Sequence, residues 1–312
     1  MQYCRARNLP ARGFDLKPGA FTHTVGDIHD PAAVEAALDG VKAVLHTATL
    51  HKPHVATHSR QAFVDTNISG TLTLLDACKR AGIPRFVFTS TTSAYGRALI
   101  PDANAPAAWI TEDVTGLPKN IYGATKIAAE ELCALAAYRD KMGVVILRTA
   151  RFFPEEDDSP EVRAAFSDAN AKANEFLYRR LDIEDAAQAH ILAAEKAETL
   201  GFDRFILSAP TPFHPEDAKA LRKNPAQVIE TYHPGTEASY AELGWSLPSD
   251  ISRVYDSRRA VARLGWKPGY DFPRVIQRAL DGQDIASPLA QAVGVKGYHD
   301  QDFQDGPYPV EA

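Results

Sequence analysis

A tyrosine and a lysine lie four residues apart in the segment NIYGATKIAAEEL, residues 120–132. Residues at this spacing lie one above the other on a helix, so Tyr122 and Lys126 can face the same cleft. A phenol is a weak base at neutral pH, but a nearby ammonium favours the phenolate and lowers the pKa of the phenol. We therefore expect Tyr122 to give and take a proton with the help of Lys126. An aromatic residue and a charge that merely share a helix face would show the same spacing.

Several hydroxyl residues precede this pair in the segment FVFTSTTSAYG, residues 86–96. The segment is typical of a buried strand that ends in polar residues, and the carboxyl ends of parallel strands border the ligand crevice of a doubly wound sheet. A hydroxyl there can hold a substrate oxygen against Tyr122, while a dinucleotide supplies or accepts a hydride. The pattern indicates redox chemistry at a carbinol carbon. Alternatively, these are ordinary β-branched strand residues without a chemical role.

The elements that would position these residues alternate along the first half of the chain. Apolar runs predict strands at 41–48, 85–90 and 143–150, and helical spacing predicts helices at 59–82 and 120–142. Strands that alternate with helices are typical of βαβ units. We predict an α/β fold with a doubly wound parallel sheet.

The second half is less regular and richer in proline and tryptophan. Its patterns predict a strand at 203–209, helices at 183–197, 214–223, 256–266 and 272–282, and an irregular tail after about 290. No repeat or low-complexity linker separates the halves, so we place a soft domain boundary near residue 150.

Composition excludes several classes of protein. The 312 residues carry a formal charge of -6 without a basic stripe, which argues against a nucleic-acid partner. No apolar run is long enough for a membrane span, and the first residues, MQYCRARNLPARG, are too polar for a signal peptide. The three cysteines have no paired spacing that would indicate zinc or a disulfide framework. We expect a cytoplasmic protein.

The beginning of the chain departs from the usual dinucleotide fold. Such a fold opens with a strand, a glycine-rich turn and a helix that receives the pyrophosphate. No GxGxxG or GxxGxxG motif occurs before residue 41, and ARGFDLKPG, residues 11–19, is typical of the end of a first helix and a second strand. We therefore expect the first βα unit to be missing, through a wrong start codon or a loss of cofactor binding.

Six segments occur in an order that resembles the extended short-chain dehydrogenase/reductases, the NAD-dependent epimerase/dehydratase family. The resemblance spans roughly residues 11–283 and rests on GDIHD (26–30), VLHTATL (44–50), DTNISGTLTLLDAC (65–78), RFVFTSTTSAYG (85–96), YGATK (122–126) and LRTARFF (147–153). It implies a Rossmann-like NAD(P)-binding domain at 1–150. It also implies a smaller, mixed α/β substrate region at 151–312 that partly returns to the sheet.

The resemblance also implies roles for individual residues. Tyr122 matches the catalytic acid/base, Lys126 matches its activator and a ligand of the nicotinamide ribose, and Thr91 matches the catalytic hydroxyl. The positions that match cofactor-contacting residues are Asp15, Asp27, Ile28, Thr47, Ala48, Asn67 and Lys126. An acid at Asp15 would favour NAD over NADP, because its charge repels a 2′-phosphate.

Two departures from the family's pattern bear on the reaction. Thr92 and Ser93 stand where the family's sugar dehydratases carry Asp and Glu, so dehydration is disfavoured and Thr92 becomes a candidate substrate contact. The segment RTAR, residues 148–151, replaces a segment like RYFN, which places recognition of a UDP-sugar in doubt. Arg151 is a second candidate substrate contact, because a guanidinium fits a carboxylate or phosphate.

Several residues also have ordinary structural interpretations. His46, His51, His54 and His58 would form a loop along the cofactor edge and no metal site, since no cysteine or paired acid completes a ligand shell. Asp15 can cap a turn, and Asn67 can hydrogen-bond locally in its helix. The acidic run EEDD, residues 155–158, is typical of a solvated loop.

The sequence therefore predicts an NAD(P)-dependent epimerase or oxidoreductase for a hydroxyl or keto group of a small molecule, with a sugar nucleotide as the first candidate. A reductase of a non-sugar carbonyl would use the same residues. A non-catalytic Rossmann-like binding protein or a truncated gene product is the third interpretation. The family's frequent dimers suggest a possible homodimer.

Overall fold

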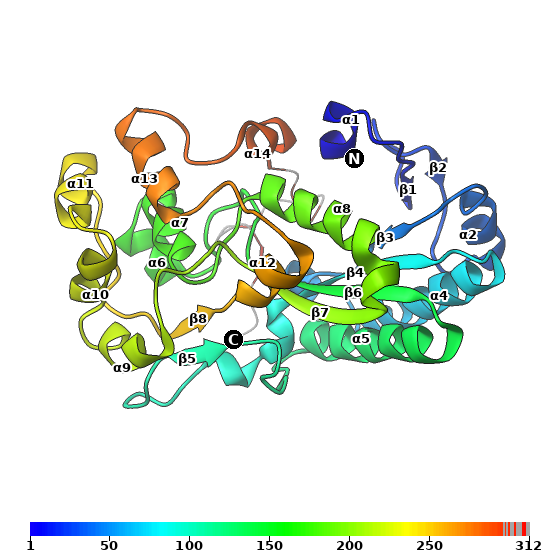
Figure 1. Cartoon of the computed structure of the whole chain (residues 1–312), viewed down its shortest axis with the longest axis horizontal. Helices are drawn as coiled ribbons and strands as arrows, with labels where there is room; N and C mark the ends of the chain where they lie inside the picture. The colour runs from blue at the N-terminus through cyan, green and yellow to red at the C-terminus, as the bar shows by residue number, and fades with distance from the viewer. Residues whose placement is uncertain (296, 298, 300–302, 304–307, 310–312) are drawn as a thin grey trace. The chain divides into compact units, whose positions relative to one another are not determined.

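The computed structural model describes residues 1–295, 297, 299, 303, 308 and 309 (Figure 1). The chain forms two compact units. The first unit contains residues 1–94, 118–148 and 187–205, and the second contains residues 95–117, 149–186 and 206–312. The chain passes several times between these units, and the predicted division into 1–150 and 151–312 stays a prediction.

The first unit is built on a sheet with the strand order β3-β4-β6-β7. The strands are β3 (Val44–His46), β4 (Arg85–Thr91), β6 (Gly143–Thr149) and β7 (Phe202–Leu207). β3 and β4 pair in parallel, with Val44 opposite Phe86. The four strands follow one another in sequence order, and β5 lies in another sheet. Parallel neighbours such as β3 and β4 require crossover connections. The predicted α/β fold with a parallel sheet is confirmed.

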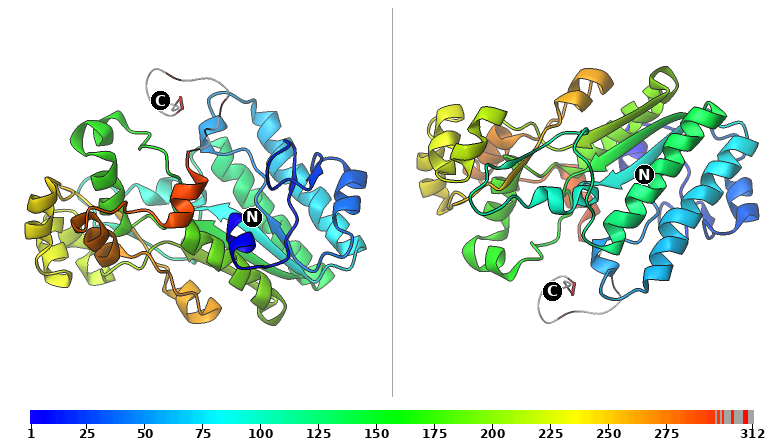
Figure 2. Two further views of the ribbon diagram at one scale, coloured as in Figure 1. Left: turned by 90° about the horizontal axis from the view of Figure 1, so that it is seen from above. Right: turned by 90° about the horizontal axis from the view of Figure 1, so that it is seen from below.

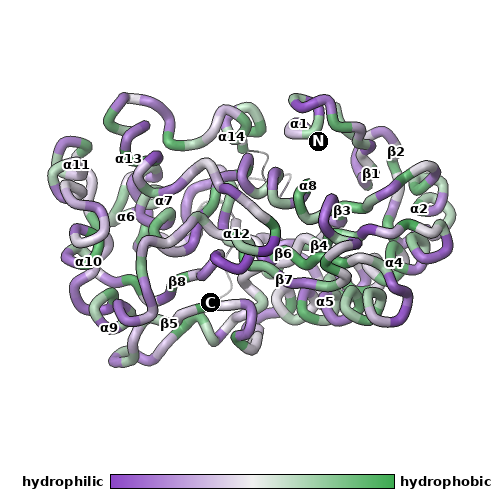
Figure 3. Tube along the Cα trace, in the orientation of Figure 1, coloured by the Kyte–Doolittle hydropathy of each residue, from purple (hydrophilic) through white to green (hydrophobic). Residues whose placement is uncertain are grey.

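Helices cover both faces of this sheet. α4 (Gly70–Arg80) and α5 (Ile121–Asp140) lie on one face, and α8 (Ile183–Leu200) lies on the other from residue 187 onward (Figures 1 and 2). A buried cluster joins Leu75 and Cys78 of α4, Phe88 of β4, Cys133 of α5 and Ile146 of β6. Hydrophobic and hydrophilic residues alternate along α5, as expected for a helix with one face on a sheet (Figure 3).

The segment predicted as one helix at 59–82 is helical but not uniform. It consists of α3 (Arg60–Val64), a π-helix η2 (Asp65–Ser69) and α4. A π-helix adds a residue to a helical turn and is rare outside functional sites. Gly70 follows it, and a Cβ there would lie 2.4 Å from Cδ1 of Ile28. This close approach explains a glycine at the start of α4.

The first forty residues form short elements. They are α1 (Gln2–Ala6), β1 (Phe14–Asp15), β2 (Thr24–Val25) and α2 (Pro31–Ala37). β1 and β2 pair in parallel, so the predicted strand around residue 15 is present in shortened form. Asp30 caps α2, because its carboxylate accepts hydrogen bonds from the amides of Ala32 and Ala33.

The second unit contains a two-stranded parallel pair, β5 (Ala108–Ile110) and β8 (Arg253–Tyr255). Its helices are α6 (Pro160–Ala165), α7 (Asp168–Phe176), α9 (Ala218–Leu221), α10 (Pro225–Tyr232), α11 (Thr236–Leu243), α12 (Arg258–Leu264), α13 (Phe272–Leu280) and α14 (Pro288–Val293). It also contains the short 3-10 helices η4 (Arg97–Leu99) and η5 (Pro215–Asp217), whereas η1 (Lys52–His54) lies in the first unit and η3 (Thr92–Tyr95) crosses the boundary between the two units. A core around Ile229, Val254 and Phe272 holds the second unit together.

The sequence predicted an irregular tail after about residue 290. This prediction is wrong for the first few residues, because α14 begins after the cap Ser287 and extends to Val293. Most positions after residue 295 lie outside the described residues. Among the helices that are described, none combines the length and the apolar composition that crossing a membrane requires.

Candidate active site

Three residues at the end of β4 hold three residues on one face of α5. A side-chain hydrogen bond links Thr91 to Tyr122. Nζ of Lys126 donates to the carbonyl oxygen of Thr89 at 2.6 Å. The Ser90 hydroxyl donates to the carboxylate of Glu130. Since the helix residues are spaced by four, they form one row along the sheet.

The start of α5 fixes the place of this row. The Asn120 side chain caps the helix by accepting a hydrogen bond from the amide of Gly123 at 3.0 Å. Gly123 leaves no room for a side chain, because a Cβ would lie 2.8 Å from the carbonyl oxygen of Ser93 and 3.2 Å from Cβ of Pro118. The first turn of the helix therefore lies directly against the chain that follows β4.

Tyr122 is a buried, neutral phenol. Burial raises the pKa of Tyr122 to about 12, although the hydrogen bond from Thr91 opposes this change. The amide of Ser93 donates to Oγ1 of Thr91 at 3.0 Å, which leaves the Thr91 hydroxyl proton for Tyr122. The sequence predicted that the Lys126 ammonium would lower the pKa of Tyr122. In this structure burial has the larger effect, because no water reaches the phenolate.

Lys126 is almost completely buried, with its ammonium 4.0 Å from the centre of the Phe88 ring. Burial lowers the pKa of Lys126 to about 7, and the electrostatic effects of Cys133 and Glu130 oppose this change. Lys126 therefore exchanges a proton near neutral pH. That property suits a residue that assists proton transfer.

Asn67 connects the π-helix to the surroundings of Lys126. Its side-chain oxygen accepts hydrogen bonds from the Thr49 hydroxyl and the Leu50 amide, both at 2.8 Å. Its side-chain nitrogen donates to the Leu50 carbonyl at 3.1 Å and to Oγ1 of Thr125 at 3.0 Å. These contacts reach well beyond the helix of Asn67, so its bonding is not merely local. A contact between Asn67 and the cofactor stays a prediction.

Two histidines lie near the row. The ring of His51 is tilted against that of Tyr122, with 6.2 Å between the centroids. His46 is buried and its Nε2 lies 2.9 Å from Oγ1 of Thr71. Burial and the charge of Lys126 lower the pKa of both histidines to about 3. Both imidazoles are therefore neutral near pH 7.

His54 and His58 continue the histidine loop, with 4.9 Å between their ring centroids. The His51 amide donates to Nδ1 of His54 at 2.9 Å, which ties the two residues together in the turn at η1. Within the part of the chain that the structure describes, no group of three or more His, Cys, Asp or Glu side chains is arranged to hold a metal ion.

The residues predicted near the adenosine lie around β1, β2 and β3. The Asp15 carboxylate accepts a hydrogen bond from the Lys17 amide at 2.9 Å, which is the turn-capping role considered above. The Asp27 carboxylate accepts from the His29 amide at 2.9 Å, and this bond lowers the pKa of Asp27. Ile28 is buried against Gly70. These contacts leave lone pairs on both carboxylates.

Thr47 and Ala48 are exposed residues that directly follow β3. They lie at the carboxyl end of a parallel strand, as expected for residues along a cofactor. A direct contact between either residue and the cofactor stays a prediction.

The two predicted substrate contacts lie in different units. Thr92 is buried directly after β4 in the first unit. Arg151 lies in the second unit, where its guanidinium forms ion pairs with Asp157 and Asp158. A substrate anion would therefore have to replace a carboxylate at Arg151. Substrate binding by Thr92 and Arg151 stays a prediction.

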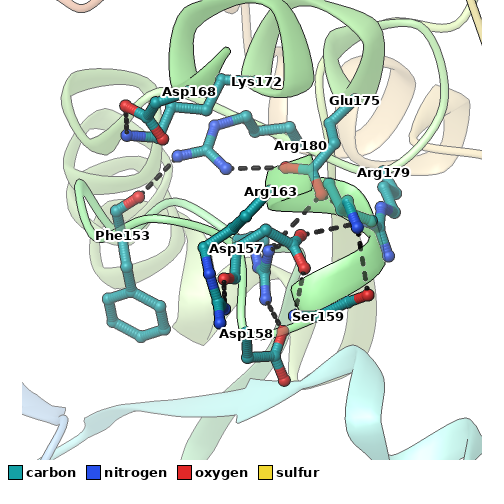
Figure 4. Close-up of polar contacts among 12 residues, drawn as sticks. Phe153, Asp157, Asp158, Ser159, Arg163, Asp168, Lys172, Glu175, Arg179 and Arg180 are labelled. Carbon is teal, nitrogen blue, oxygen red and sulfur yellow. Dashed lines mark hydrogen bonds and ion pairs between the residues drawn. The ribbon is translucent and has the colours of Figure 1, made fainter. Parts of the chain in front are cut away.

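The acidic run at 155–158 is not the solvated loop that its composition indicates. Asp157 and Asp158 are largely buried because they pair with Arg151. Glu175 of α7 joins the same cluster, pairing with Arg180 at 2.7 Å and with Arg179 at 2.5 Å (Figure 4). The sequence alone did not indicate this cluster, since its members are far apart along the chain.

The buried carboxylate of Glu130 was also missed. Arg148 holds it with two hydrogen bonds, from Nε at 2.9 Å and from Nη2 at 2.7 Å. A signal was present, because Glu130 follows Lys126 by four residues and must share its helix face. In a helix rich in alanine and glutamate, that spacing is also typical of a solvated residue.

The comparisons with known proteins agree with this arrangement. The model of the NAD dependent epimerase/dehydratase family matches residues 3–205, more than half of the chain. UDP-glucose 4-epimerase of Rhizobium meliloti is 39% identical over 289 residues, which cover 81% of each chain. A protein named y4nG from Sinorhizobium fredii is 33% identical over 142 residues, 44% of this chain, and the chain spans about a third of that relative's length.

The fold has solved counterparts. A short-chain dehydrogenase/reductase superfamily protein from Agrobacterium tumefaciens, crystallised with bound NAD, superimposes with a TM-score of 0.62 at 23% identity. The match covers 90% of this chain and 91% of that one. At this identity the likeness concerns the fold. The predicted cofactor, NAD, is confirmed as the cofactor of the family.

The residues at the strand end fit the nicotinamide end of such a cofactor. An ammonium has three N–H donors, and the contact of Lys126 with Thr89 uses one of them. The remaining donors suit the hydroxyls of a ribose. For the pyrophosphate we assign no residue, because residues 1–40 contain no glycine-rich turn of the GxGxxG or GxxGxxG kind.

Proposed function

The chain belongs to the NAD dependent epimerase/dehydratase family, and from this premise we propose that it oxidises and reduces a hydroxyl group of a small molecule. A sugar nucleotide is the substrate that we favour, and epimerisation is the reaction. The near relative named as a UDP-glucose 4-epimerase supports this choice, since the match extends over four fifths of both chains.

The observation that carries the proposal is the row formed by Thr91, Tyr122 and Lys126. As a phenolate, Tyr122 removes the proton of the substrate hydroxyl, and as the resulting phenol it later returns that proton. The Thr91 hydroxyl, already bonded to Tyr122, holds the substrate oxygen at the same point. Lys126, whose pKa lies at about 7, exchanges protons with the surroundings of the tyrosine.

Bound NAD would supply the hydride chemistry of the reaction. In our proposal Lys126 holds its nicotinamide ribose, and Asp15, Asp27, Ile28, Thr47, Ala48 and Asn67 line its remaining length. Because burial holds the pKa of Tyr122 at about 12, a positive charge near the phenol would be needed to favour its phenolate.

A reductase of a non-sugar carbonyl is the second candidate. The segment at 148–151 supports it, because Arg148 and Arg151 are both held in ion pairs with carboxylates of their own chain.

Turnover without added cofactor separates these candidates. The 312-residue chain is incubated with UDP-glucose, and UDP-galactose is measured by chromatography, with and without NAD. The epimerase is supported if UDP-galactose forms with or without added NAD and if the rate falls by about 10²- to 10⁴-fold in Tyr122→Phe. A need for one equivalent of NADH per turnover of a ketone supports the reductase instead.

Binding is measured on the same samples. Titration with NAD by calorimetry should show one site. If neither NAD nor NADP binds the chain, the catalytic proposal fails.

A further inference from the structure

Glu130 is a fully buried carboxylate one helical turn after Lys126. Its oxygens accept hydrogen bonds from the Ser90 hydroxyl and from Nε and Nη2 of Arg148, at 2.9 and 2.7 Å. Nε of Arg204 lies 3.1 Å from the same carboxylate. Strands β4, β6 and β7 each provide one of these contacts, so the carboxylate is held from three sides.

Arg148 and Arg204 share the buried carboxylate of Glu130, and Nη2 of Arg204 also lies 3.7 Å from the exposed carboxylate of Glu131. The Arg148 side chain is 5% exposed, whereas that of Arg204 is 24% exposed. Burying such groups is unfavourable unless they are paired, so a cluster in the core needs a reason beyond stability. The nearest functional group on the same helix face is the ammonium of Lys126.

Apart from Glu130 and its arginines, four ionisable groups of the described residues lie near Lys126, and they carry no charge near pH 7. The two imidazoles that face it from β3 and the following loop, His46 and His51, have pKa values of about 3. Burial raises the pKa of the Cys133 thiol far above neutrality, so the thiol does not ionise. The phenol of Tyr122, on the same helix, has a pKa of about 12. The carboxylate of Glu130 is thus the anion that faces Lys126.

We propose that Glu130 and Arg148 are positioning residues that set the charge of Lys126 at the proposed active site. The carboxylate favours the ammonium form of Lys126. Arg148 limits that effect by pairing with the same carboxylate. The proposal rests on the proposed function only for its catalytic consequence, because the charge of Lys126 can be measured without turnover.

Removing either partner should therefore move the pKa of Lys126 in opposite directions. In Glu130→Gln the two guanidinium groups lose their anion, so the pKa of Lys126 should fall by about one pH unit. In Arg148→Met the carboxylate keeps only Arg204, so the pKa of Lys126 should rise by a similar amount. A merely structural role would destabilise both variants and would not produce opposite shifts.

The measurement uses protein with ¹³C-labelled lysine side chains. The Cε resonance of Lys126, assigned from its absence in Lys126→Arg, is followed by NMR from about pH 5.5 to 10. Glu195→Gln is the control, because it removes the same charge from an exposed position of α8 outside the cluster. Its pKa curve for Lys126 should overlay that of the parent protein.

Opposite shifts in Glu130→Gln and Arg148→Met support the proposal. Shifts of this pair in one direction, or none beyond the Glu195→Gln control, overturn it. If Glu130→Gln does not fold, Arg204→Gln is compared with Arg148→Met instead, and each of these variants removes one positive charge beside Glu130. Upward shifts in both then support the proposal, and a downward or absent shift in either overturns it.

The same variants distinguish this inference from the proposed function. If the parent protein has no turnover and the opposite shifts are still observed, the proposed function fails while the inference about Lys126 holds. If turnover is present without opposite shifts, the function holds and the inference fails. Where both hold, the midpoint of the pH profile of kcat should move in the direction of each NMR shift.

Discussion

The side-chain nitrogen of Asn67 donates a hydrogen bond to Oγ1 of Thr125 at 3.0 Å, next to Lys126 in α5. The same side chain holds both backbone groups of Leu50. The side-chain amide of Asn67 thus joins the π-helix η2, the loop after β3 and the helix α5. The loop in question also carries His51, whose ring lies against Tyr122.

Replacing Asn67 with alanine should therefore loosen this loop. The variant removes the partner of the half-buried Leu50 amide and one of the two hydrogen bonds to the Leu50 carbonyl, which the Thr49 hydroxyl still contacts. This loss should lower the free energy of unfolding by about 1–3 kcal/mol. Hydrogen exchange of residues 49–51 should become faster, as mass spectrometry can measure. Asn104→Ala, at an exposed position, is the control. If residues 49–51 exchanged at the same rate in both variants, Asn67 would not hold this loop in place.

Replacing Thr91 with valine should impair Tyr122 at constant side-chain shape. The hydrogen bond from Thr91 lowers the pKa of Tyr122, so its loss should raise that pKa further. If our functional proposal is correct, kcat should fall by about 10²- to 10³-fold. The limb of the pH profile that reports Tyr122 should move to higher pH. Thr231→Val, on an exposed face of α10, should leave both quantities unchanged.

Replacing Gly123 with alanine should displace the chain after β4. The new Cβ would lie 2.8 Å from the Ser93 carbonyl oxygen, so the backbone must move. We expect a loss of about 1–3 kcal/mol in stability, measured by urea unfolding. Gly19→Ala is the control, because its nearest neighbour would be Oγ1 of Thr22 at 3.4 Å. A Gly123→Ala variant as stable as Gly19→Ala would show that the first turn of α5 has more room than the structure indicates.

His46 should make the protein sensitive to acid. Burial, and then the charge of Lys126, lower its pKa from 6.5 to about 3, so the unfolded chain binds more protons than the folded chain between these values. Stability is then complete above pH 6.5 and decreases as the pH falls towards 3. At pH 5 the loss from this residue should be about 2 kcal/mol.

His46→Gln tests this assignment, since glutamine can still donate to Thr71 but does not titrate. Melting temperatures from pH 4 to 8 should depend less on pH in this variant than in the parent protein. His58→Gln, at an exposed position in the same loop, serves as the comparison. Identical pH dependence in all three proteins would rule out His46 as the source.

Much of the first unit follows from the sequence pattern. The strand at 85–90 and the helix at 120–142 were predicted within two residues of β4 and α5, because a continuous apolar run and a long alanine-rich helix have few alternatives. The row of Tyr122 and Lys126 along β4 follows from helical spacing alone. The partners Thr89 and Thr91 depend on how the helix crosses the strand, which spacing does not define.

Other features depend on contacts between distant residues. The π-helix at 65–69 keeps the apolar spacing of an ordinary helix, so the sequence pattern did not indicate it. The pair of β5 and β8 joins segments 145 residues apart, with three residues in each strand. α10 and α11 were not predicted, because short helices next to proline and glycine have weak periodic patterns.

The pKa of Tyr122 was the least predictable quantity. Its sequence neighbours indicate a helpful ammonium, whereas its value is set by how completely the fold excludes water from the phenol. Two groups four residues apart can interact strongly or weakly, depending on where the ammonium donates its bonds. In this fold one of those bonds is directed to the Thr89 carbonyl.

The fixed spacing of Tyr122, Lys126 and Glu130 against β4 has a consequence for natural variation in this chain. Adding or deleting one residue between positions 122 and 130 would rotate everything beyond it by about 100° around the helix axis. Such a change would turn at least one of the three side chains away from the strand. Related sequences should therefore vary in residue type along this stretch far more readily than in its length.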